Sequence, residues 1–197
     1  MKSASKAPAD APIMSFRTSR EWLSWLAMNH AKSGGIWLKI AKKGAEGKSV
    51  TYDEALAAAL CYGWIDGQKK GYDEAAWLQK FSARAPRSIW SRINREKAQA
   101  LIDSGQMKPA GQKAIDRARE NGQWSAAYDG QRGIEVPADL QKELDARPDA
   151  RTFFEGLNSV NRYAILHRIQ TAKKPETRTR RIRHFVEMLE KHEKIYP

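Results

Sequence analysis

Cysteine and histidine are scarce in this sequence, and their scarcity excludes several kinds of site. The one cysteine, Cys61, rules out an internal disulfide framework and a cysteine-based zinc site. It stands in an apolar run, which favours buried packing over nucleophilic chemistry. The four histidines are scattered and lack the paired spacing of catalytic zinc sites. We therefore predict no metal and no cofactor.

Long apolar runs and glycine-rich nucleotide-binding motifs are lacking as well. No stretch approaches the roughly 18 apolar residues that a membrane span needs. The chain contains no P-loop, no dinucleotide fingerprint and no serine-hydrolase elbow. Residues 1–12 hold two lysines and small side chains without an apolar core, which predicts a disordered tail rather than a signal peptide. We expect a cytoplasmic protein without a membrane span.

Positive charge and tryptophan are abundant by contrast. The 197 residues include 35 Lys and Arg against 23 Asp and Glu, a net charge of +12. Such an excess favours anionic partners, namely nucleic acid, phosphorylated metabolites or an anionic membrane surface, although it can also serve solubility alone. Hydrophobic residues make up 41% and include seven tryptophans, enough for a substantial core. The length suits one domain with a helical addition.

Capping signals and hydrophobic periodicity predict an α+β front half with a small antiparallel sheet flanked by helices. The capping box Thr51-x-x-Glu54 opens an alanine-rich helix. The elements expected in order are a helix capped by Ser19 and running to His30, a strand at Ile36–Ala41, the helix from Thr51 to Tyr62, a short strand and turn at Trp64–Gly67, the rest of an antiparallel hairpin over 68–83, a helix from Ser88 or Ser91 to Ser104, and a helix at Pro109–Asn121.

The strand signals stop after the glycine-containing connection at 123–136. Four helices are predicted there, and proline at the first position explains the first and last starts. Their expected bounds are Pro137–Arg147, Asp149–Leu157, Ser159–Lys173 and Pro175–Lys194. The sequence thus predicts a tail at 1–12, an α+β domain at 13–132 and a helical C-terminal region at 133–197.

Four segments carry a resemblance to a known family. They are residues 59–67 (ALCYGWIDG), 87–94 (RSIWSRIN), 107–111 (MKPAG) and 175–182 (PETRTRRI). In this order they resemble the YdeI/OmpD-associated (OmdA) family, over nearly the whole chain from Ile13. The resemblance implies a bacterial protein of stress resistance that protects against bacteriocins and antimicrobial peptides. It also implies a front half similar to YjbR/CyaY-like α+β domains and an OmdA-like C-terminal region.

The strongest candidate binding site joins the 64–67 segment to residues 84–94. On a helix that begins near Ser88, Ile93 and Asn94 fall on the buried face, so the Asn94 amide needs partners there. Two serines would stand at the helix start, where backbone N–H groups attract anions, and two arginines precede them. The structural alternative is a set of caps, surface arginines and a turn carboxylate at Asp66. The candidate ligand-binding residues are Trp64, Asp66, Arg84, Arg87, Ser88, Trp90, Ser91 and Asn94.

A run of arginines marks the back end. Residues 162–183 hold eight Arg and Lys and one acid, Glu176. Arg178 lies at the edge of the buried face of its helix, where it can serve as a salt bridge or as an anion ligand, whereas Arg180 and Arg183 point outward. Together with Arg181 these residues form a basic patch suited to backbone phosphates, or simply a solvated face.

Three functions therefore stay open at this stage. The favoured one is a non-catalytic stress or bacteriocin-protection protein that binds a small anionic ligand or a partner through the 64–94 region. The second is a nucleic-acid-binding protein that uses the arginines of 162–183. The third is an enzyme with Asp66 as a base in a basic pocket.

Overall fold

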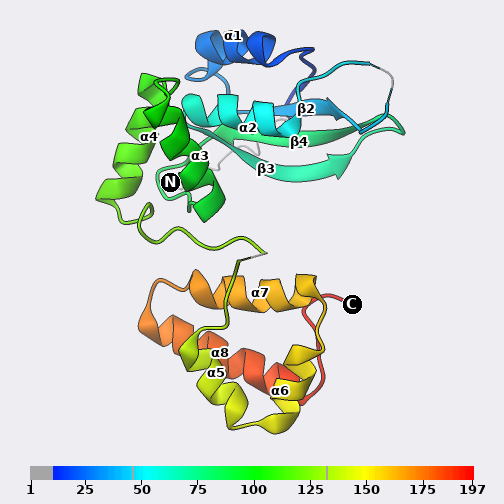
Figure 1. Cartoon of the computed structure of the whole chain (residues 1–197), viewed down its shortest axis with the longest axis vertical. Helices are drawn as coiled ribbons and strands as arrows, with labels where there is room; N and C mark the ends of the chain where they lie inside the picture. The colour runs from blue at the N-terminus through cyan, green and yellow to red at the C-terminus, as the bar shows by residue number, and fades with distance from the viewer. Residues whose placement is uncertain (1–10, 46, 132) are drawn as a thin grey trace, which may run out of the picture. The chain divides into compact units, whose positions relative to one another are not determined.

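The computed structural model describes residues 11–45, 47–131 and 133–197, and it divides into two compact units. The first comprises the chain up to Trp90 together with Asn94–Ala126, and the second comprises Ser91–Ile93 together with Ala127–Pro197. Most of the predicted tail, residues 1–10, lies outside the described residues. Helices and a sheet segregate along the chain as predicted, so the α+β class is confirmed (Figure 1).

The first unit contains a four-stranded sheet with the order β1-β2-β4-β3. Its strands are β1 (Ile13–Met14), β2 (Ile36–Ala41), β3 (Trp64–Gly71) and β4 (Ala76–Ala83). The pairs β2–β4 and β3–β4 are antiparallel, but β1 runs parallel to β2. The prediction of a purely antiparallel sheet is therefore wrong, because a two-residue edge strand has no periodicity of its own to be read from the sequence.

Helices α1 (Ser19–Asn29) and α2 (Tyr52–Cys61) lie over one face of this sheet (Figure 1). The layer between them is aromatic: Trp22 and Phe81 are fully buried, with ring centroids 5.8 Å apart. The Trp22 indole N–H donates to the Ala55 carbonyl oxygen at 3.0 Å, so the bulky ring is buried without losing its hydrogen bond. Burial of this aromatic layer fixes both helices on the sheet.

Side-chain caps set where these two helices begin. Thr51 and Glu54 form the predicted capping box at the start of α2. For α1 the cap is Thr18 rather than Ser19: Thr18 has extended backbone angles, and its hydroxyl accepts from the Glu21 N–H. Two adjacent hydroxyl residues satisfy the same capping signal, which accounts for the one-residue error.

Helices α3 (Arg92–Asp103) and α4 (Pro109–Glu120) complete the helical part of this region. A Cβ atom added to Gly111 of α4 would come within 2.4 Å of the Cys61 carbonyl oxygen and 2.7 Å of that of Leu60. Only glycine allows the α4 backbone to approach the end of α2 so closely. The MKPAG segment is thus explained by packing: Pro109 starts the helix, and Gly111 permits the contact.

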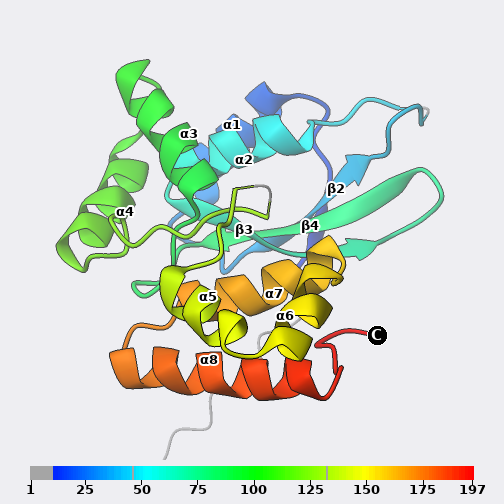
Figure 2. The ribbon, with the colours of Figure 1, turned by 60° about the horizontal axis from the view of Figure 1, so that its bottom comes forward.

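The second unit contains four helices, as predicted: α5 (Ala138–Asp145), α6 (Pro148–Glu155), α7 (Ser159–Gln170) and α8 (Pro175–Glu190) (Figure 2). Pro175 is the first residue of α8, but Pro137 is the N-cap of α5 rather than its first residue. The last two helices end three or four residues before their predicted ends. Their shared core is aliphatic, with Leu140, Ile165 and Val186 fully buried around Phe154.

Candidate anion-binding cleft

Trp64 is a core residue of the first unit. Its side chain is 1% exposed and lies edge-on to Trp25, with ring centroids 5.8 Å apart. The indole N–H donates to the His30 carbonyl oxygen at 3.0 Å. These contacts tie the start of β3 to the end of α1, so the geometry gives Trp64 a structural role.

Asp66 lies inside β3 and points toward α2. The sequence places it in a turn, but the strand continues to Gly71, with an irregularity in the register between Asp66 and Lys69. Asp66 is half-buried, and its carboxylate accepts from the Tyr52 hydroxyl at 2.9 Å. The predicted turn is therefore wrong, because one glycine in a polar run does not distinguish a turn from a bulged strand.

Arg84 is buried, with 5% of its surface exposed. Its guanidinium lies 3.6 Å from the centre of the Trp90 ring, and Nη1 donates to the Ile89 carbonyl oxygen at 3.2 Å. Its backbone carbonyl accepts from Arg117 of α4 at 3.2 Å. Arg84 thus holds the loop before α3 through stacking and hydrogen bonds.

Of the two predicted starts of α3, Ser91 is confirmed, because it directly precedes the first helical residue, Arg92. Ser88 lies in a turn, where its N–H donates to the Ala85 carbonyl oxygen. Ile93 is 52% exposed, so its predicted burial is wrong: it lies about 100° around the helix from Asn94, outside the buried face. Asn94 is buried as predicted, and Arg87 is exposed.

A basic cleft of the first unit lies elsewhere, where α1 and α2 begin and β2 ends. It encloses about 750 Å³. Four cationic side chains line it: Arg17, Lys42, Lys43 and Lys48. Hydroxyl groups of Thr18, Ser19, Ser49, Thr51 and Tyr52 accompany them, together with Ile40, Glu54 and Trp77.

The electrostatics of this cleft favour an anion. Among the described residues that line the cleft, Glu54 is the acidic one. Its Oε2 accepts from the Thr51 N–H at 2.9 Å and from the Thr51 hydroxyl at 2.7 Å. Those hydrogen bonds lower its pKa, so the group is committed to the cap of α2. Glu46, in the same loop, lies outside the described residues. The two helix N-termini add partial positive charge to that of the four cations.

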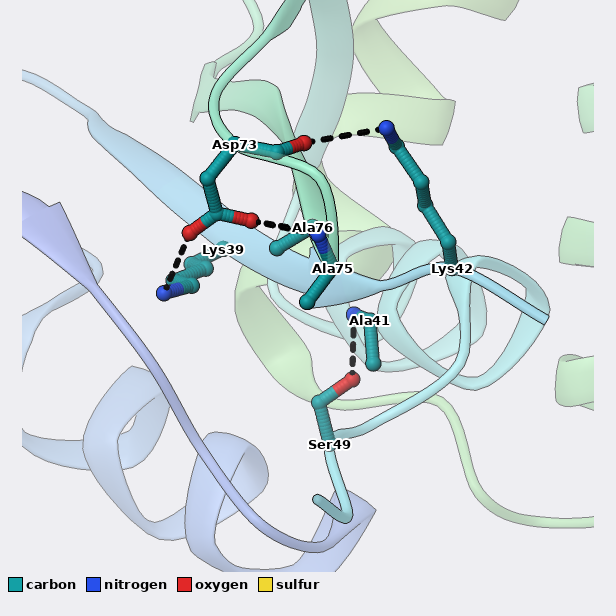
Figure 3. Close-up of polar contacts among 7 residues, drawn as sticks. All are labelled: Lys39, Ala41, Lys42, Ser49, Asp73, Ala75 and Ala76. Atoms are coloured by element: carbon teal, nitrogen blue, oxygen red, sulfur yellow. Dashed lines mark hydrogen bonds and ion pairs between the residues drawn. The ribbon is translucent and has the colours of Figure 1, made fainter. Parts of the chain in front are cut away.

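The loop that carries the lysines is anchored at both ends (Figure 3). The Lys42 ammonium donates to the Asp73 carbonyl oxygen at 2.9 Å, and the Asp73 carboxylate pairs with Lys39 at 3.1 Å. At the other end, the Ser49 hydroxyl accepts from the Ala41 N–H at 2.9 Å. The loop is therefore tied to the β3–β4 turn and to β2, which positions the lysines along the cleft.

One wall of the cleft is aromatic. The rings of Tyr52 and Trp77 are 6.1 Å apart, and the Lys69 ammonium lies 4.2 Å from the centre of the Trp77 ring. The Tyr52 hydroxyl is held by Asp66, which links this wall to the 64–67 segment. The cleft thus combines a cationic rim with a flat apolar surface, a combination that suits a ligand with an anionic group and a ring.

This cleft was not predicted, although each of its parts is present in the sequence. The three lysines around the glycine turn at 42–48 and the two capping threonines, Thr18 and Thr51, stand in three separate segments of the chain. Their convergence depends on two helices starting at the same end of the sheet, which local sequence patterns do not encode.

Comparison with known families gives one match for each part of the chain. A domain of unknown function, DUF8412, matches residues 14–114, about half of the chain, and the family described as "Bacteriocin-protection, YdeI or OmpD-Associated" (OmdA) matches residues 133–192. The chain belongs to the DUF8412 family and carries an OmdA domain. No curated protein and no solved structure matches it.

The predicted OmdA resemblance is confirmed, but the match covers residues 133–192 rather than nearly the whole chain. Of the four quoted segments, 175–182 lies within the OmdA match, whereas 59–67, 87–94 and 107–111 lie within the DUF8412 match. The cleft residues from Arg17 to Trp77 all belong to the DUF8412 part.

The arginines of the OmdA domain are partly structural. Arg178 forms a bidentate ion pair with Asp139, with N–O distances of 2.6 and 2.8 Å. It also donates to the Ile169 carbonyl oxygen. Hydrogen bonding to Arg178 lowers the pKa of Asp139. Of the two predicted roles for Arg178, the salt bridge is confirmed. Arg180 and Arg183 are exposed, as predicted, and Arg181 is half-buried.

No group of three or more His, Cys, Asp or Glu side chains suited to a metal ion occurs among the described residues. Nor do the described ranges contain a helix with the length and apolar character needed to cross a bilayer.

Proposed function

We propose that this chain binds a small phosphorylated or carboxylated ligand in the basic cleft of its DUF8412 part, and that this binding supports bacteriocin protection, the role in the OmdA description. The observation that carries the proposal is the set of four cations around one cleft at two helix starts. The volume lies in the range of small-molecule sites, about 300–1,000 Å³. A cytoplasmic location remains part of the same proposal.

The cleft suits an anion better than a neutral ligand for an electrostatic reason. Arg17, Lys43 and Lys48 are exposed, so water solvates their positive charges when no ligand is bound. These charges attract an anion, whereas they do not attract a neutral ligand. The Tyr52 and Trp77 rings supply an apolar surface that inorganic phosphate leaves uncovered. We therefore expect a ligand that carries a ring or a chain beside its anionic group.

The site predicted at 64–94 connects to this cleft through Asp66 and its hydrogen bond to Tyr52. Arg84, Arg87, Ser88, Trp90, Ser91 and Asn94 stay predicted ligand contacts in a separate region. The two locations are separable by mutation, since Arg87 is exposed and its removal leaves the stacked Arg84–Trp90 pair in place.

Calorimetric titration with ATP, pyrophosphate and citrate tests the proposal. The double variant Lys43→Ala/Lys48→Ala should weaken binding by about tenfold or more, equivalent to about 1.4 kcal/mol. The control Lys113→Ala/Lys191→Ala removes the same charge from exposed positions outside the cleft and should change affinity much less. Equal losses in both variants would mean that net charge alone attracts the anions, and a loss in Arg87→Ala would locate the site at 84–94.

Bacteriocin protection is tested separately in cells. A strain that lacks the protein should be more sensitive to bacteriocin, and wild-type protein should restore survival. The Lys43→Ala/Lys48→Ala variant should restore it poorly although it accumulates to the same level. Full restoration by this variant would separate the cleft from the protective role.

The enzyme alternative keeps one specific observation, the Asp66 carboxylate within 2.9 Å of a hydroxyl that lines the cleft. Asp66→Asn retains an oxygen that accepts from Tyr52, so the fold should persist. Loss of a turnover activity in this variant without loss of stability would favour a base at Asp66.

The nucleic-acid alternative now rests on the exposed Arg180 and Arg183, because Arg178 is occupied by Asp139. Binding of DNA or RNA at low salt that falls steeply as salt rises would support it. A loss of that binding in Arg180→Ala/Arg183→Ala would place the contact on α8.

A further inference from the structure

A second cavity lies within the OmdA domain, between α7, α8 and the segment that follows α8. It encloses about 480 Å³. Its cationic lining comes from Arg168 of α7 and Arg181 of α8, with His167 beside them. Tyr163, Tyr196 and Val160 supply the aromatic and apolar part.

The two arginines are fixed by neutral oxygen atoms. Arg168 donates to the Ala164 carbonyl oxygen at 2.9 Å and approaches the Tyr196 hydroxyl at 3.4 Å. Arg181 donates to the carbonyl oxygen of Arg168, the residue that follows His167. These bonds hold both guanidinium groups in place while leaving their positive charge uncompensated by the bond itself.

Two other arginines of the same unit are balanced by carboxylates. Arg147 pairs with Glu143 and Glu190, and Arg151 pairs with Asp145 and Glu155. In contrast, no ion pair joins Arg168 or Arg181 to a carboxylate among the described residues. The cavity therefore gathers two arginines whose charges are not neutralised in the way that those of Arg147 and Arg151 are.

The remaining walls suit a flat ring. The rings of Tyr163 and His167 are 5.4 Å apart, and the Arg168 guanidinium lies 5.9 Å from the centre of the Tyr196 ring. Val160 is 53% exposed and Tyr196 is 44% exposed, so apolar surface is available at the rim. A ligand that carries only a charge would leave this surface in water.

We propose that this cavity binds a small aromatic anion, a ring that bears a carboxylate or a phosphate. The anionic group lies against the guanidinium groups of Arg168 and Arg181, whose planar forks match both kinds of oxyanion. The ring packs against Val160, Ala164 and the tyrosines. This site is independent of the cleft in the DUF8412 part.

The bound anion also acts on His167. Burial lowers the pKa of this histidine, and the positive charges of Arg168 and Arg181 lower it further. The groups that face it from other positions are the rings of Tyr128 and Tyr163. An anion beside the two arginines offsets their effect, so binding raises the pKa of His167 and grows stronger as the pH falls and this histidine becomes protonated.

Titration of the full chain with benzoate and phenyl phosphate tests the proposal, read out by calorimetry and by the NMR signal of the His167 ring. Inorganic phosphate and benzyl alcohol are the controls for charge alone and ring alone. We expect both aromatic anions to bind at least about tenfold more tightly than either control, a difference of about 1.4 kcal/mol. Equal binding of inorganic phosphate, or no shift of the His167 signal, would overturn the proposal.

Variants at the exposed rim keep the test independent of folding. Val160→Glu puts a negative charge beside the cavity and should weaken binding of the aromatic anions about tenfold, whereas Val160→Gln should not. Arg181→Gln should weaken binding of the aromatic anions as strongly as Val160→Glu does. A comparison of inorganic phosphate with benzyl alcohol in this variant should show that the contact with the anionic group is lost. Unchanged affinity in Val160→Glu would show that the aromatic anions bind elsewhere. The Lys43→Ala/Lys48→Ala variant should keep the wild-type affinity for these anions.

Discussion

The two units handle their positive charges and their cores in different ways. All seven tryptophans stand in the first unit, the last of them Trp124, and the core of the second is built from Leu, Ile, Val and Phe. In the first unit, lysines lie over aromatic rings, as Lys70 does over Trp37 at 4.2 Å and Lys69 over Trp77. In the second, Arg147, Arg151 and Arg178 pair with carboxylates.

This difference explains where each unit leaves charge available. A lysine over a ring keeps its full charge, since the ring has only a quadrupole to offer. An arginine paired with a carboxylate loses most of its field. Both units thus keep cations available: the four around the cleft in the first, and in the second Arg168 and Arg181 at the cavity together with the exposed Arg180 and Arg183. Tryptophan fluorescence reports on the first unit alone, which makes the comparison measurable.

The largest expected effect is in the aliphatic core. Phe154→Ala removes a ring that is 2% exposed and should lower the free energy of unfolding of the second unit by about 3–5 kcal/mol. Helical circular dichroism should be lost at lower denaturant, whereas tryptophan fluorescence should change at its usual midpoint. Val160→Ala, at an exposed position of the same unit, is the control. A shift of both signals together would show that the units unfold as one.

Gly111→Ala tests the stability of the first unit. The added Cβ meets the carbonyl oxygens of Cys61 and Leu60, so α4 must move away from α2 at a cost of about 3 kcal/mol. The tryptophan fluorescence midpoint should fall accordingly. Gly34→Ala, where nothing lies within 4 Å of the added atom, should shift it far less. Similar shifts in the two variants would refute the close α2–α4 contact.

Arg178→Ala should have a smaller effect on the second unit, about 1–2 kcal/mol, because it removes an ion pair and a hydrogen bond at a partly exposed position. The pKa of Asp139 is lowered in the folded state, so the stability from this pair is present above about pH 4 and is lost as the pH falls further. Chemical denaturation at several pH values measures both the loss of stability in Arg178→Ala and its dependence on pH. Arg180→Ala is the exposed control and should stay within about 0.5 kcal/mol of wild type.

The smallest effect concerns His167. Its pKa is lowered by burial, so between that folded value and the unfolded one near 6.5 the unfolded chain binds more protons. The second unit should therefore lose stability as the pH falls below about 6.5. His167→Gln should flatten this dependence, and His184→Gln, at an exposed position, should not. An unchanged slope in His167→Gln would assign the effect to other groups.

Much of the local structure was predictable because its signals are local. Strand β2 has the predicted bounds, the Thr51–Glu54 capping box forms, and α4 begins at Pro109. The start of α3 was left open between Ser88 and Ser91 because both give the same capping signal, and only the turn at Ala85–Ser88 distinguishes them. Asp66 and Gly67, in the middle of β3, were predicted as a turn because a polar, glycine-containing run carries no alternation.

The candidate sites were harder to predict. Arg178 was identified at the edge of a buried face, and helical spacing alone supports that inference. Whether it meets Asp139 or a ligand depends on α5, more than thirty residues earlier in the chain, so the sequence left both roles open.

The sequence by itself determined the class of fold, the four C-terminal helices, the excess of positive charge and the family resemblance. Each of these depends on composition, on periods of a few residues, or on short contiguous segments. Only the tertiary structure decided which cations share a surface. Thr18 and Thr51 come to one cleft because α1 and α2 start at the same end of the sheet, and the lysines follow because Asp73 holds their loop there. Charge is counted along the chain, but an anion responds to distance in space.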